Sequence, residues 1–321
     1  MKARTLWHNK TRSWIESDNL KEPKSGELLI KSLFSMVSQG TERTVITQNL
    51  SSGVAERMAI PYMQGSLMDT FTYGYSLVGE VVSGDESLIG RRVHLMHPHQ
   101  DYLRITTNDI FLIPDTVDSK TATLASNMET VVNAIWDAEI NLGDKVLVMG
   151  YGLIGGLIAT VLSQMPGVRY AVVETDSFRR KILEESEHAV FADTDGIEEF
   201  YDVVFNTTSN ESALQRALEI TGDEGRIIEL SWYGGKNTIL KLGADFHYGR
   251  KQIISSQVSQ IPFKKQPRWN YFNRKELVFE LLSKLDFTSF ISSEITFEET
   301  PEFYLKLRNN EVQHLNTIIH Y

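Results

Sequence analysis

The sequence predicts an α/β protein in which a β-rich domain is followed by a doubly wound parallel-sheet domain. From residue 2 to about residue 115, short strand-like runs are separated by turn residues, which is typical of a barrel or a sandwich. From residue 144 onward, strand-like and helix-like runs alternate, which indicates parallel strands with helices on both faces of the sheet. This second region begins with a strand candidate that passes directly into a glycine-rich turn and a helix.

The individual elements follow from local pattern. In the first region, strands are expected at 27–34, 75–82 and 91–96. The segment 41–72 is less regular and is expected to be helical in part, and loops of this kind often frame a pocket. In the second region, a helix at 121–138 precedes strands at 146–149, 170–174, 201–205 and 225–230 and helices at 155–164, 177–186, 211–220, 274–285 and 301–308.

Composition narrows the class of partner. The chain has 321 residues, a net charge of −10 and no extended basic cluster, so neither nucleic acid nor an anionic membrane is an expected partner. It contains no cysteine, which excludes disulfides, thiolate nucleophiles and cysteine-based zinc sites. A small-molecule substrate is therefore favoured.

Targeting signals are not evident. Lys2 and Arg4 are not followed by an apolar run, so no signal peptide is expected and a cytoplasmic location is the default. Residues 146–165 are uncharged and about as long as a membrane helix. However, they include four glycines and lack flanking Lys or Arg clusters, so a buried strand and its helix are the better interpretation.

The glycine-rich turn predicts a dinucleotide site. Gly150 permits a tight strand-to-helix turn, Gly152 leaves room for a pyrophosphate, and Gly155 lets the helix lie close to the strand. The turn residues Leu153 and Ile154 complete the GxGxxG pattern. The phosphates would meet the unpaired N–H groups at the start of the helix.

An acidic residue follows the second strand of this unit. Glu174 lies 24 residues after Gly150, close to where a carboxylate binds the ribose hydroxyls and repels a 2′-phosphate. We therefore expect NAD(H) to be preferred over NADP(H). Arg179 stands just downstream and leaves NADP(H) possible. The alternative is that Glu174 is a solvated acid at the end of a strand.

The order of these parts resembles the medium-chain dehydrogenase/reductase superfamily along nearly the whole chain. The motifs that carry the resemblance are ELLIKSLFSMVSQGTERTVI, YGYSLVGEVV, HPHQDY, ASNMETVVNAIWDA, INLGDKVLVMGYGLIGGLIA, DVVFNTTSNESAL and ELSWYG. They are similar to a subgroup called zinc-binding alcohol dehydrogenase-like, with a distant similarity to bacteriochlorophyllide dehydrogenases. The resemblance implies a GroES-like catalytic domain at 1–125, completed by 257–321, and a Rossmann domain at 126–256.

The zinc-binding positions of the family differ in this sequence. The positions where the resemblance would place zinc ligands carry Gln39, Tyr75 and Ser126, and the four-cysteine structural lobe is absent. A catalytic zinc ion needs about three protein ligands around an open position. We therefore expect a zinc-free member of the superfamily.

Without zinc, charge on the substrate oxygen has to be stabilised by other groups. The resemblance places Thr41 at the family's proton-relay hydroxyl. Tyr75 is the next candidate, as a phenol that donates to a carbonyl oxygen, with packing as the alternative. His97 is another candidate because imidazole titrates near working pH, although it and His99 are also suited to satisfying local turns. Glu129 would be a general acid or a charge on a helix surface.

Further cofactor contacts are implied by the same resemblance. Thr130 matches a position beside the nicotinamide, and Ser231 and Trp232 follow a strand that approaches the carboxamide. Trp232 is equally suited to packing between domains. The strand before them would wall the adenosine side with Asn206, Thr207 and Thr208.

The resemblance also implies a homodimer formed along the last Rossmann strand, expected near 246–250 with its entry at 255–257. Our first functional hypothesis is an NAD(P)(H)-dependent, zinc-independent oxidoreductase that acts on a carbonyl or an alcohol. The alternatives are a quinone or enone reductase, and a sensor that binds a dinucleotide without catalysis. A small basic group, Lys264, Lys265 and Arg268, attracts an anionic substrate in one interpretation and is a solvated loop in the other.

Overall fold

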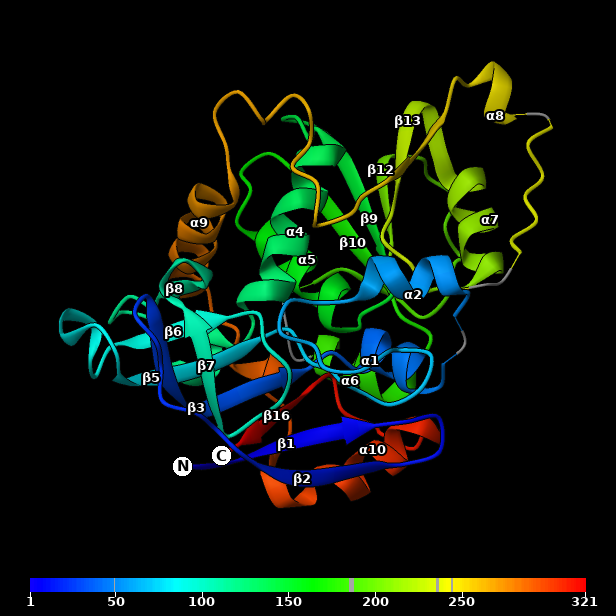
Figure 1. Cartoon of the computed structure of the whole chain (residues 1–321). Helices are drawn as coiled ribbons and strands as arrows, with labels where there is room; N and C mark the ends of the chain where they lie inside the picture. The colour runs from blue at the N-terminus through cyan, green and yellow to red at the C-terminus, as the bar shows by residue number, and fades with distance from the viewer. Residues whose placement is uncertain (49, 185–187, 235–236, 244) are drawn as a thin grey trace. The chain divides into compact units, whose positions relative to one another are not determined.

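A computed structural model of the chain describes residues 1–48, 50–184, 188–234, 237–243 and 245–321. It divides the chain into two compact units, and each is described by itself below. Unit 1 comprises Met1–Ser126 and Phe279–Tyr321, and unit 2 comprises Asn127–Val278. The division falls within two helices, α4 (Ala125–Ala138) and α9 (Tyr271–Lys284) (Figure 1).

Residues 257–278 belong to unit 2 in this division, whereas the sequence-based domain limits assign them to the first domain. The side chain of Asn133 accounts for the difference, because its amide nitrogen donates to the carbonyls of Gln257 and Gln260 at 3.2 and 3.0 Å. The predicted catalytic and cofactor domains stay a prediction.

Unit 1 is built mainly from antiparallel strands. One sheet has the order β15-β16-β3-β5-β6-β8, with β7 also paired to β3, and the other has the order β2-β1-β4. The strands are β1 (Lys2–His8), β2 (Ser13–Asn19), β3 (Glu27–Val37), β4 (Phe71–Thr72), β5 (Leu77–Ser83), β6 (Arg92–Leu95), β7 (Tyr102–Thr106), β8 (Ile110–Leu112), β15 (Glu294–Thr296) and β16 (Thr317–His320). Alternating apolar side chains such as Leu28, Ile30 and Val81 pack into one core cluster on the larger sheet.

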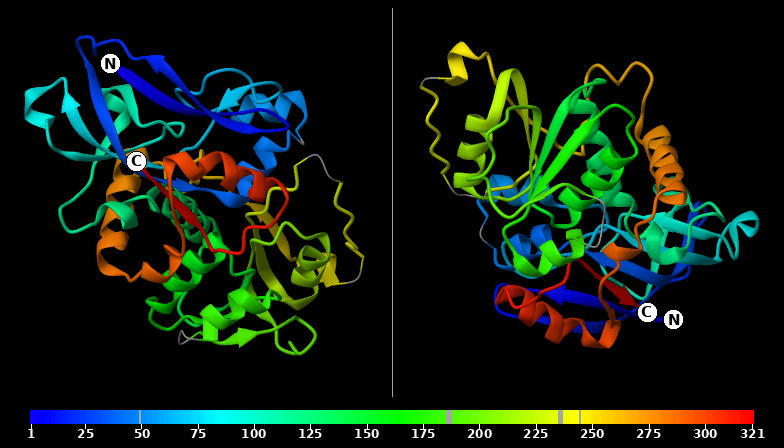
Figure 2. Two further views of the ribbon diagram at one scale, coloured as in Figure 1. Left: turned by 90° about the horizontal axis from the view of Figure 1, so that it is seen from below. Right: turned by 180° about the vertical axis from the view of Figure 1, so that it is seen from behind.

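The helices of unit 1 are short. The irregular segment predicted to be partly helical contains α1 (Gln39–Ile46) and α2 (Ser52–Met58), and the remaining helices are α3 (Ser119–Ala122) and α10 (Thr300–Arg308). Single 3₁₀ turns occur at Glu86–Leu88, Thr107–Asp109, Thr288–Phe290 and Phe297–Glu299. Helix α10 packs against β2, as the right-hand view of Figure 2 shows.

Unit 2 is a doubly wound parallel sheet with the order β11-β10-β9-β12-β13-β14. Its strands are β9 (Lys145–Met149), β10 (Arg169–Val173), β11 (Val190–Phe191), β12 (Tyr201–Asn206), β13 (Thr221–Glu229) and β14 (Gln252–Ser255). All five pairings are parallel. This is the strand order of dinucleotide-binding sheets, in which two similar halves meet at the first strand.

Helices cover the sheet of unit 2. Helix α5 (Leu153–Ser163) contacts β9 and β10, and α7 (Glu211–Ile220) contacts β12 and β13 (Figure 1). The other helices are α6 (Ser177–Glu184) and α8 (Asp245–Tyr248). The central strands β9 and β12 have almost entirely buried side chains, as expected for strands covered on both faces.

One predicted element was wrong. The last strand of the parallel sheet was expected near 246–250, but that segment contains α8, and the strand is β14, Gln252–Ser255. A helical turn forms there because the carbonyl of Asp245 accepts the N–H of Gly249 at 2.8 Å. In the described part of the chain, no helix is both long and apolar enough to span a membrane.

Candidate functional site

The glycine-rich turn joins β9 to α5, and it requires glycine at two positions, one because of its backbone conformation and one because of lack of space. Gly150 has φ +95°, a region that residues with a Cβ atom rarely adopt. At Gly155, an added Cβ atom would lie 1.9 Å from the carbonyl oxygen of Gly150. The helix therefore starts in direct contact with the end of the strand. Leu153 and Ile154 form the first residues of α5.

Gly152 differs from these two because its side-chain position is open. A Cβ atom there would meet only the guanidinium of Arg179, at 3.8 Å. Gly152 is also the N-cap residue of α5, without a side-chain cap. The first N–H groups of the helix are thus available to an anion at the positive end of the helix dipole. Together with Arg179, they form a cradle that fits a pyrophosphate.

Glu174 follows β10 and is 5% exposed, so the solvated-acid alternative is wrong. One carboxylate oxygen accepts the N–H of Tyr151 at 2.7 Å, and the other accepts the N–H of Asp176 at 2.8 Å. Arg179 lies 3.9 Å from the same carboxylate. Because a carboxylate has about four acceptor positions, capacity remains for two ribose hydroxyls. The carboxylate therefore braces the glycine turn through the N–H of Tyr151.

The next strands bring further polar groups to the same edge of the sheet. Asn206 is the register partner of both Met149 and Glu229. The hydroxyl of Thr207 donates to the carbonyl of Met149 at 2.9 Å, so this residue braces the glycine turn. The hydroxyl of Thr208 donates to the side chain of Asn206 at 2.8 Å.

The sequence analysis missed two residues in this group, Glu229 and Tyr233. The carboxylate of Glu229 accepts the amide of Asn206 at 2.8 Å, the N–H of Ser231 at 2.7 Å and the hydroxyl of Tyr233 at 3.2 Å. Burial and this carboxylate raise the pKa of Tyr233 to about 12. Glu229 could have been identified from the sequence because it stands at the end of a predicted strand, as Glu174 does. Trp232 is half-buried beside them.

Glu129 lies on α4 within a buried cluster of charges. Its carboxylate binds Arg274 at 3.2 Å and Lys275 at 2.5 Å, both from α9. The three side chains are buried, so the interpretation of Glu129 as a helix-surface charge is wrong. Both cations bind this carboxylate directly, which weighs against a role as a general acid. Thr130 is the next residue and is half-buried.

In unit 1, the candidate catalytic groups gather at the start of α1. The hydroxyl of Tyr75 donates to the hydroxyl of Ser38, and the N–H of Ser38 donates to Glu42 at 2.8 Å. Thr41 lies in the first turn of the same helix and is half-buried. Tyr75 and Thr41 are therefore positioned by the same N-terminal turn.

Glu42 is fully buried and is satisfied by three donors. Besides the N–H of Ser38, the hydroxyl of Tyr304 donates to it, and the Nε2 atom of His99 lies 3.3 Å away. The other ring nitrogen of His99 is 2.7 Å from the hydroxyl of Ser35. Burial and the neighbouring carboxylate raise the pKa of Tyr304 well above its usual value. Tyr304, which the sequence analysis did not identify, thus anchors the turn that carries Thr41.

His97 is buried, and its Nδ1 atom lies 2.9 Å from the carbonyl of Pro98. Its ring stacks on Tyr62 at 5.4 Å. Burial lowers the pKa of His97 to about 4, so the ring is neutral near pH 7. These contacts favour the alternative in which His97 satisfies a local turn.

The positions of the family's zinc ligands do not fit a zinc ion. Gln39 offers an amide, and the hydroxyl of Ser126 donates to the carbonyl of Tyr75 at 2.8 Å. Tyr75 is engaged with Ser38. Across the described residues, no group of three or more His, Asp or Glu side chains is arranged to hold a metal. Zinc needs deprotonated ligands in a tetrahedral arrangement, which this donor set does not supply.

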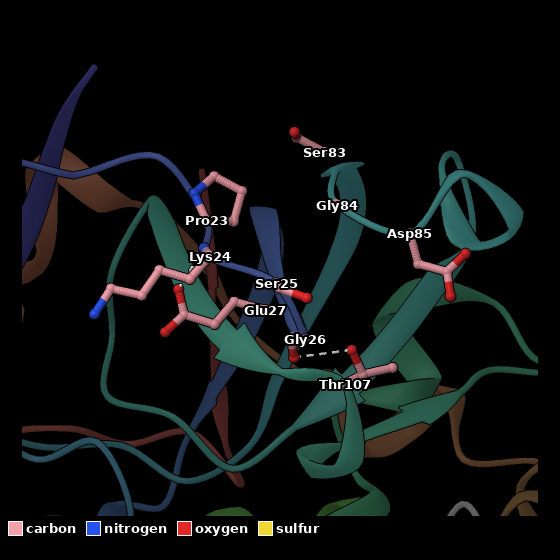
Figure 3. A pocket seen from close by; sticks show the side chains of 9 residues that line it. All are labelled: Pro23, Lys24, Ser25, Gly26, Glu27, Ser83, Gly84, Asp85 and Thr107. Carbon is pink, nitrogen blue, oxygen red and sulfur yellow. Dashed lines mark hydrogen bonds between the residues drawn. The ribbon is translucent and has the colours of Figure 1, made fainter.

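One surface pocket of unit 1 is about 450 Å³ in volume, and none of these candidate residues lines it (Figure 3). It is lined by turn residues including Gly26, Glu27, Asp85 and Thr107. Two of its charged groups are already engaged: Asp85 caps the turn at Ser87, and Glu27 pairs with Arg104 at 3.1 Å. The pocket joins three turns and is not the candidate site.

Comparison with known proteins agrees with this architecture. An L-idonate 5-dehydrogenase from Escherichia coli K-12 superposes with a TM-score of 0.80 at 13% identity, covering 100% of this chain and 99% of that one. A short chain alcohol dehydrogenase from Escherichia coli CFT073, solved with NADH, superposes with a TM-score of 0.78 at 14% identity and the same coverage. The chain has the fold of the medium-chain dehydrogenases/reductases. This confirms the fold class expected from the sequence.

Similarity in sequence is more limited. A D-guloside 3-dehydrogenase from Shigella flexneri is 26% identical over 201 residues, which are 58% of this chain and 57% of the relative. The match thus spans little more than half the length of that relative. No protein-family model matches the chain.

Proposed function

We propose that this protein is a zinc-independent oxidoreductase that transfers hydride between a nicotinamide dinucleotide and the carbonyl or alcohol of a small molecule. The observation that carries the proposal is the turn between β9 and α5. Gly155 contacts Gly150 so closely that no side chain fits, whereas Gly152 faces an open position beside Arg179. A turn built in this way serves the binding of a pyrophosphate.

Different residues of unit 2 would bind different parts of the cofactor. The helix N-terminus and Arg179 would hold the phosphates, and Glu174 would accept the ribose hydroxyls. NAD(H) is preferred over NADP(H) because a 2′-phosphate would meet the carboxylate of Glu174. Further along the edge, Ser231, Trp232 and Thr130 would take the second nucleotide, and Asn206 and Thr208 would line the adenosine side. The bound nicotinamide supplies the hydride that the amino acids themselves cannot provide.

The residues of unit 1 would supply the proton and stabilise charge on oxygen. Tyr75 is half-buried and its hydroxyl is a hydrogen-bond donor, and Thr41 is held in the same helical turn. A phenol that donates to the substrate oxygen replaces part of the charge stabilisation that zinc gives in related enzymes. His97 and Glu129 have weaker support, because one is neutral and buried and the other is bound to two cations.

A sugar-derived alcohol or its ketone is the substrate class we favour. The support comes from relatives named for guloside and idonate oxidation. The abundance of uncharged hydroxyl and amide groups among the candidate residues suits a polyhydroxylated substrate, since each hydroxyl needs a partner. We also expect a homodimer, paired along the exposed edge of β14.

The test combines binding with turnover. NADH and NADPH would first be titrated by calorimetry, and NADH oxidation or NAD⁺ reduction would then be followed with sugar ketones, polyols, quinones and enones. Turnover of sugar ketones or polyols supports the proposal, and turnover restricted to quinones or enones supports the reductase alternative. NADH binding without turnover of any probe favours a sensor.

The role of Tyr75 has a matched control. Tyr75→Phe should lower kcat at least 100-fold, the usual contribution of a proton donor. Tyr73→Phe removes the neighbouring buried hydroxyl, which donates to the carbonyl of Met58 at 3.3 Å, and should leave kcat within about twofold. Equal activity of the two variants would remove Tyr75 from the mechanism.

A further inference from the structure

The end of β13 carries a carboxylate that the proposed cofactor site does not yet explain. Glu229 is the last residue of that strand. Its partners are the amide of Asn206, the N–H of Ser231 and the hydroxyl of Tyr233, all of which are neutral. Tyr233 stays protonated because its pKa is raised to about 12. Within the described part of the chain, no Lys, Arg or His forms an ion pair with Glu229.

The place of this carboxylate in the sheet is fixed by register. Four adjacent strands end in register: Val173 is paired with Met149, Met149 with Asn206, and Asn206 with Glu229. Adjacent strands are about 4.8 Å apart, so β13 lies roughly 14 Å from β10 along the edge. Glu174 and Glu229 thus lie on opposite sides of the glycine turn.

The two nucleotide halves of a dinucleotide bound along this edge lie on opposite sides of the glycine turn. The pyrophosphate occupies the turn after β9, and the acid after β10 takes the adenosine ribose. The second half, which carries the nicotinamide, then lies over β12 and β13. Glu229 is therefore on the nicotinamide side, whereas Glu174 is on the adenosine side.

We infer that Glu229 makes the site discriminate between the two redox states of the cofactor and favour the oxidised one. The inference rests on the proposed function. The oxidised nicotinamide ring carries a positive charge and the reduced ring is neutral, so a half-buried carboxylate without a cation stabilises the first and not the second. The protein then captures NAD⁺ and releases NADH, the order needed to oxidise an alcohol.

The experiment needs binding measurements only. Kd values for NAD⁺, NADH and ADP-ribose would be measured by calorimetry on the full chain and on Glu229→Gln, whose amide oxygen keeps an acceptor for Asn206. We expect the ratio of the NADH Kd to the NAD⁺ Kd to fall about tenfold in the variant. The Kd of ADP-ribose, which lacks the nicotinamide, should stay within about twofold.

The control lies on the same strand. Glu224 is the fourth residue of β13 and pairs with Arg250 on the surface. Glu224→Gln changes the net charge equally, about 17 Å away by strand rise, and should leave the ratio unchanged.

Each other outcome overturns the inference. An unchanged ratio in Glu229→Gln would do so while leaving the proposed function intact. An equal loss of affinity for all three ligands would show that Glu229 only supports the fold of the edge. Failure of the unaltered chain to bind NAD⁺ or NADH would overturn the proposed function as well.

Discussion

The glycine turn allows stability and binding to be separated with two substitutions. In Gly155→Ala, the new methyl group would lie 1.9 Å from the carbonyl oxygen of Gly150 and 2.9 Å from the hydroxyl of Thr207. Carbon atoms do not approach backbone oxygen this closely, so α5 has to move away from β9. We expect a loss of about 3 kcal/mol, near the upper end for an overpacked site. Calorimetry should show a Tm lowered by roughly 6–12 °C.

Gly152→Ala makes the same chemical change three residues earlier. The nearest atom belongs to the flexible side chain of Arg179, at 3.8 Å, and the N-cap conformation at φ −78° is open to alanine. Stability should change by about 1 kcal/mol or less, the cost of alanine at an N-cap. The methyl group would instead occupy the approach of the pyrophosphate, so NADH affinity should fall at least tenfold.

The two variants are thus expected to fail in different assays. The reasoning would be refuted by a Gly155→Ala protein as stable as the parent, or by a Gly152→Ala protein that binds NADH with the parent's affinity. Urea titrations at one pH and calorimetric titrations with NADH, both on the full chain, decide the two questions independently.

Three further outcomes are expected. Glu174→Gln should lower the ratio of the NADPH Kd to the NADH Kd about tenfold, because the repulsion of the 2′-phosphate is removed. Glu219→Gln on α7 is the control. An unchanged ratio in Glu174→Gln would count against the proposed cofactor preference. Burial lowers the pKa of His97 from 6.5 to about 4, so the unfolded chain binds more protons in this range and stability is lost as the pH falls from 6.5 towards 4. Urea titrations at pH 7 and pH 4.5 measure the drop in the free energy of unfolding between these pH values, and His97→Gln should make this drop smaller by about 2–3 kcal/mol. An unaltered drop would contradict the lowered pKa of His97. Glu129→Ala leaves Arg274 and Lys275 buried without their carboxylate and should lower the free energy of unfolding by about 3–5 kcal/mol. The control Glu276→Ala, an exposed change on α9, should lower it little. Similar values for both variants would show that the buried cluster does not stabilise the fold.

The parallel sheet was predictable because its strands carry strong local signals. The run ending at Met149 is apolar and β-branched, and it is followed by glycines with distinct roles, so the unit from β9 to β10 was identified almost to its limits. β14 was misplaced because its sequence, QIIS, is short and largely exposed. Only the tertiary pairing with Ile227 and Ile228 makes it a strand.

The candidate catalytic groups were predictable in part. The resemblance to a family pointed to Tyr75 and Thr41, but the residues that hold them are distant in sequence. Tyr304 donates to Glu42 from 262 residues away, a contact that no local pattern reveals. Glu129 was misjudged for a similar reason, because its two cations come from a helix more than a hundred residues later.

The position of β16 in the larger sheet of unit 1 has a consequence for synthesis of the protein. This strand pairs with β3 on one side and β15 on the other, and it leaves the ribosome after all of unit 2. The parallel sheet therefore contains every strand it needs while β3 can pair with β5 and β7 but not yet with β16. Because domains tend to fold as units during translation, the half proposed to hold the cofactor is complete first. Unit 1, which carries Tyr75, is complete only after residues 317–320 have been synthesised.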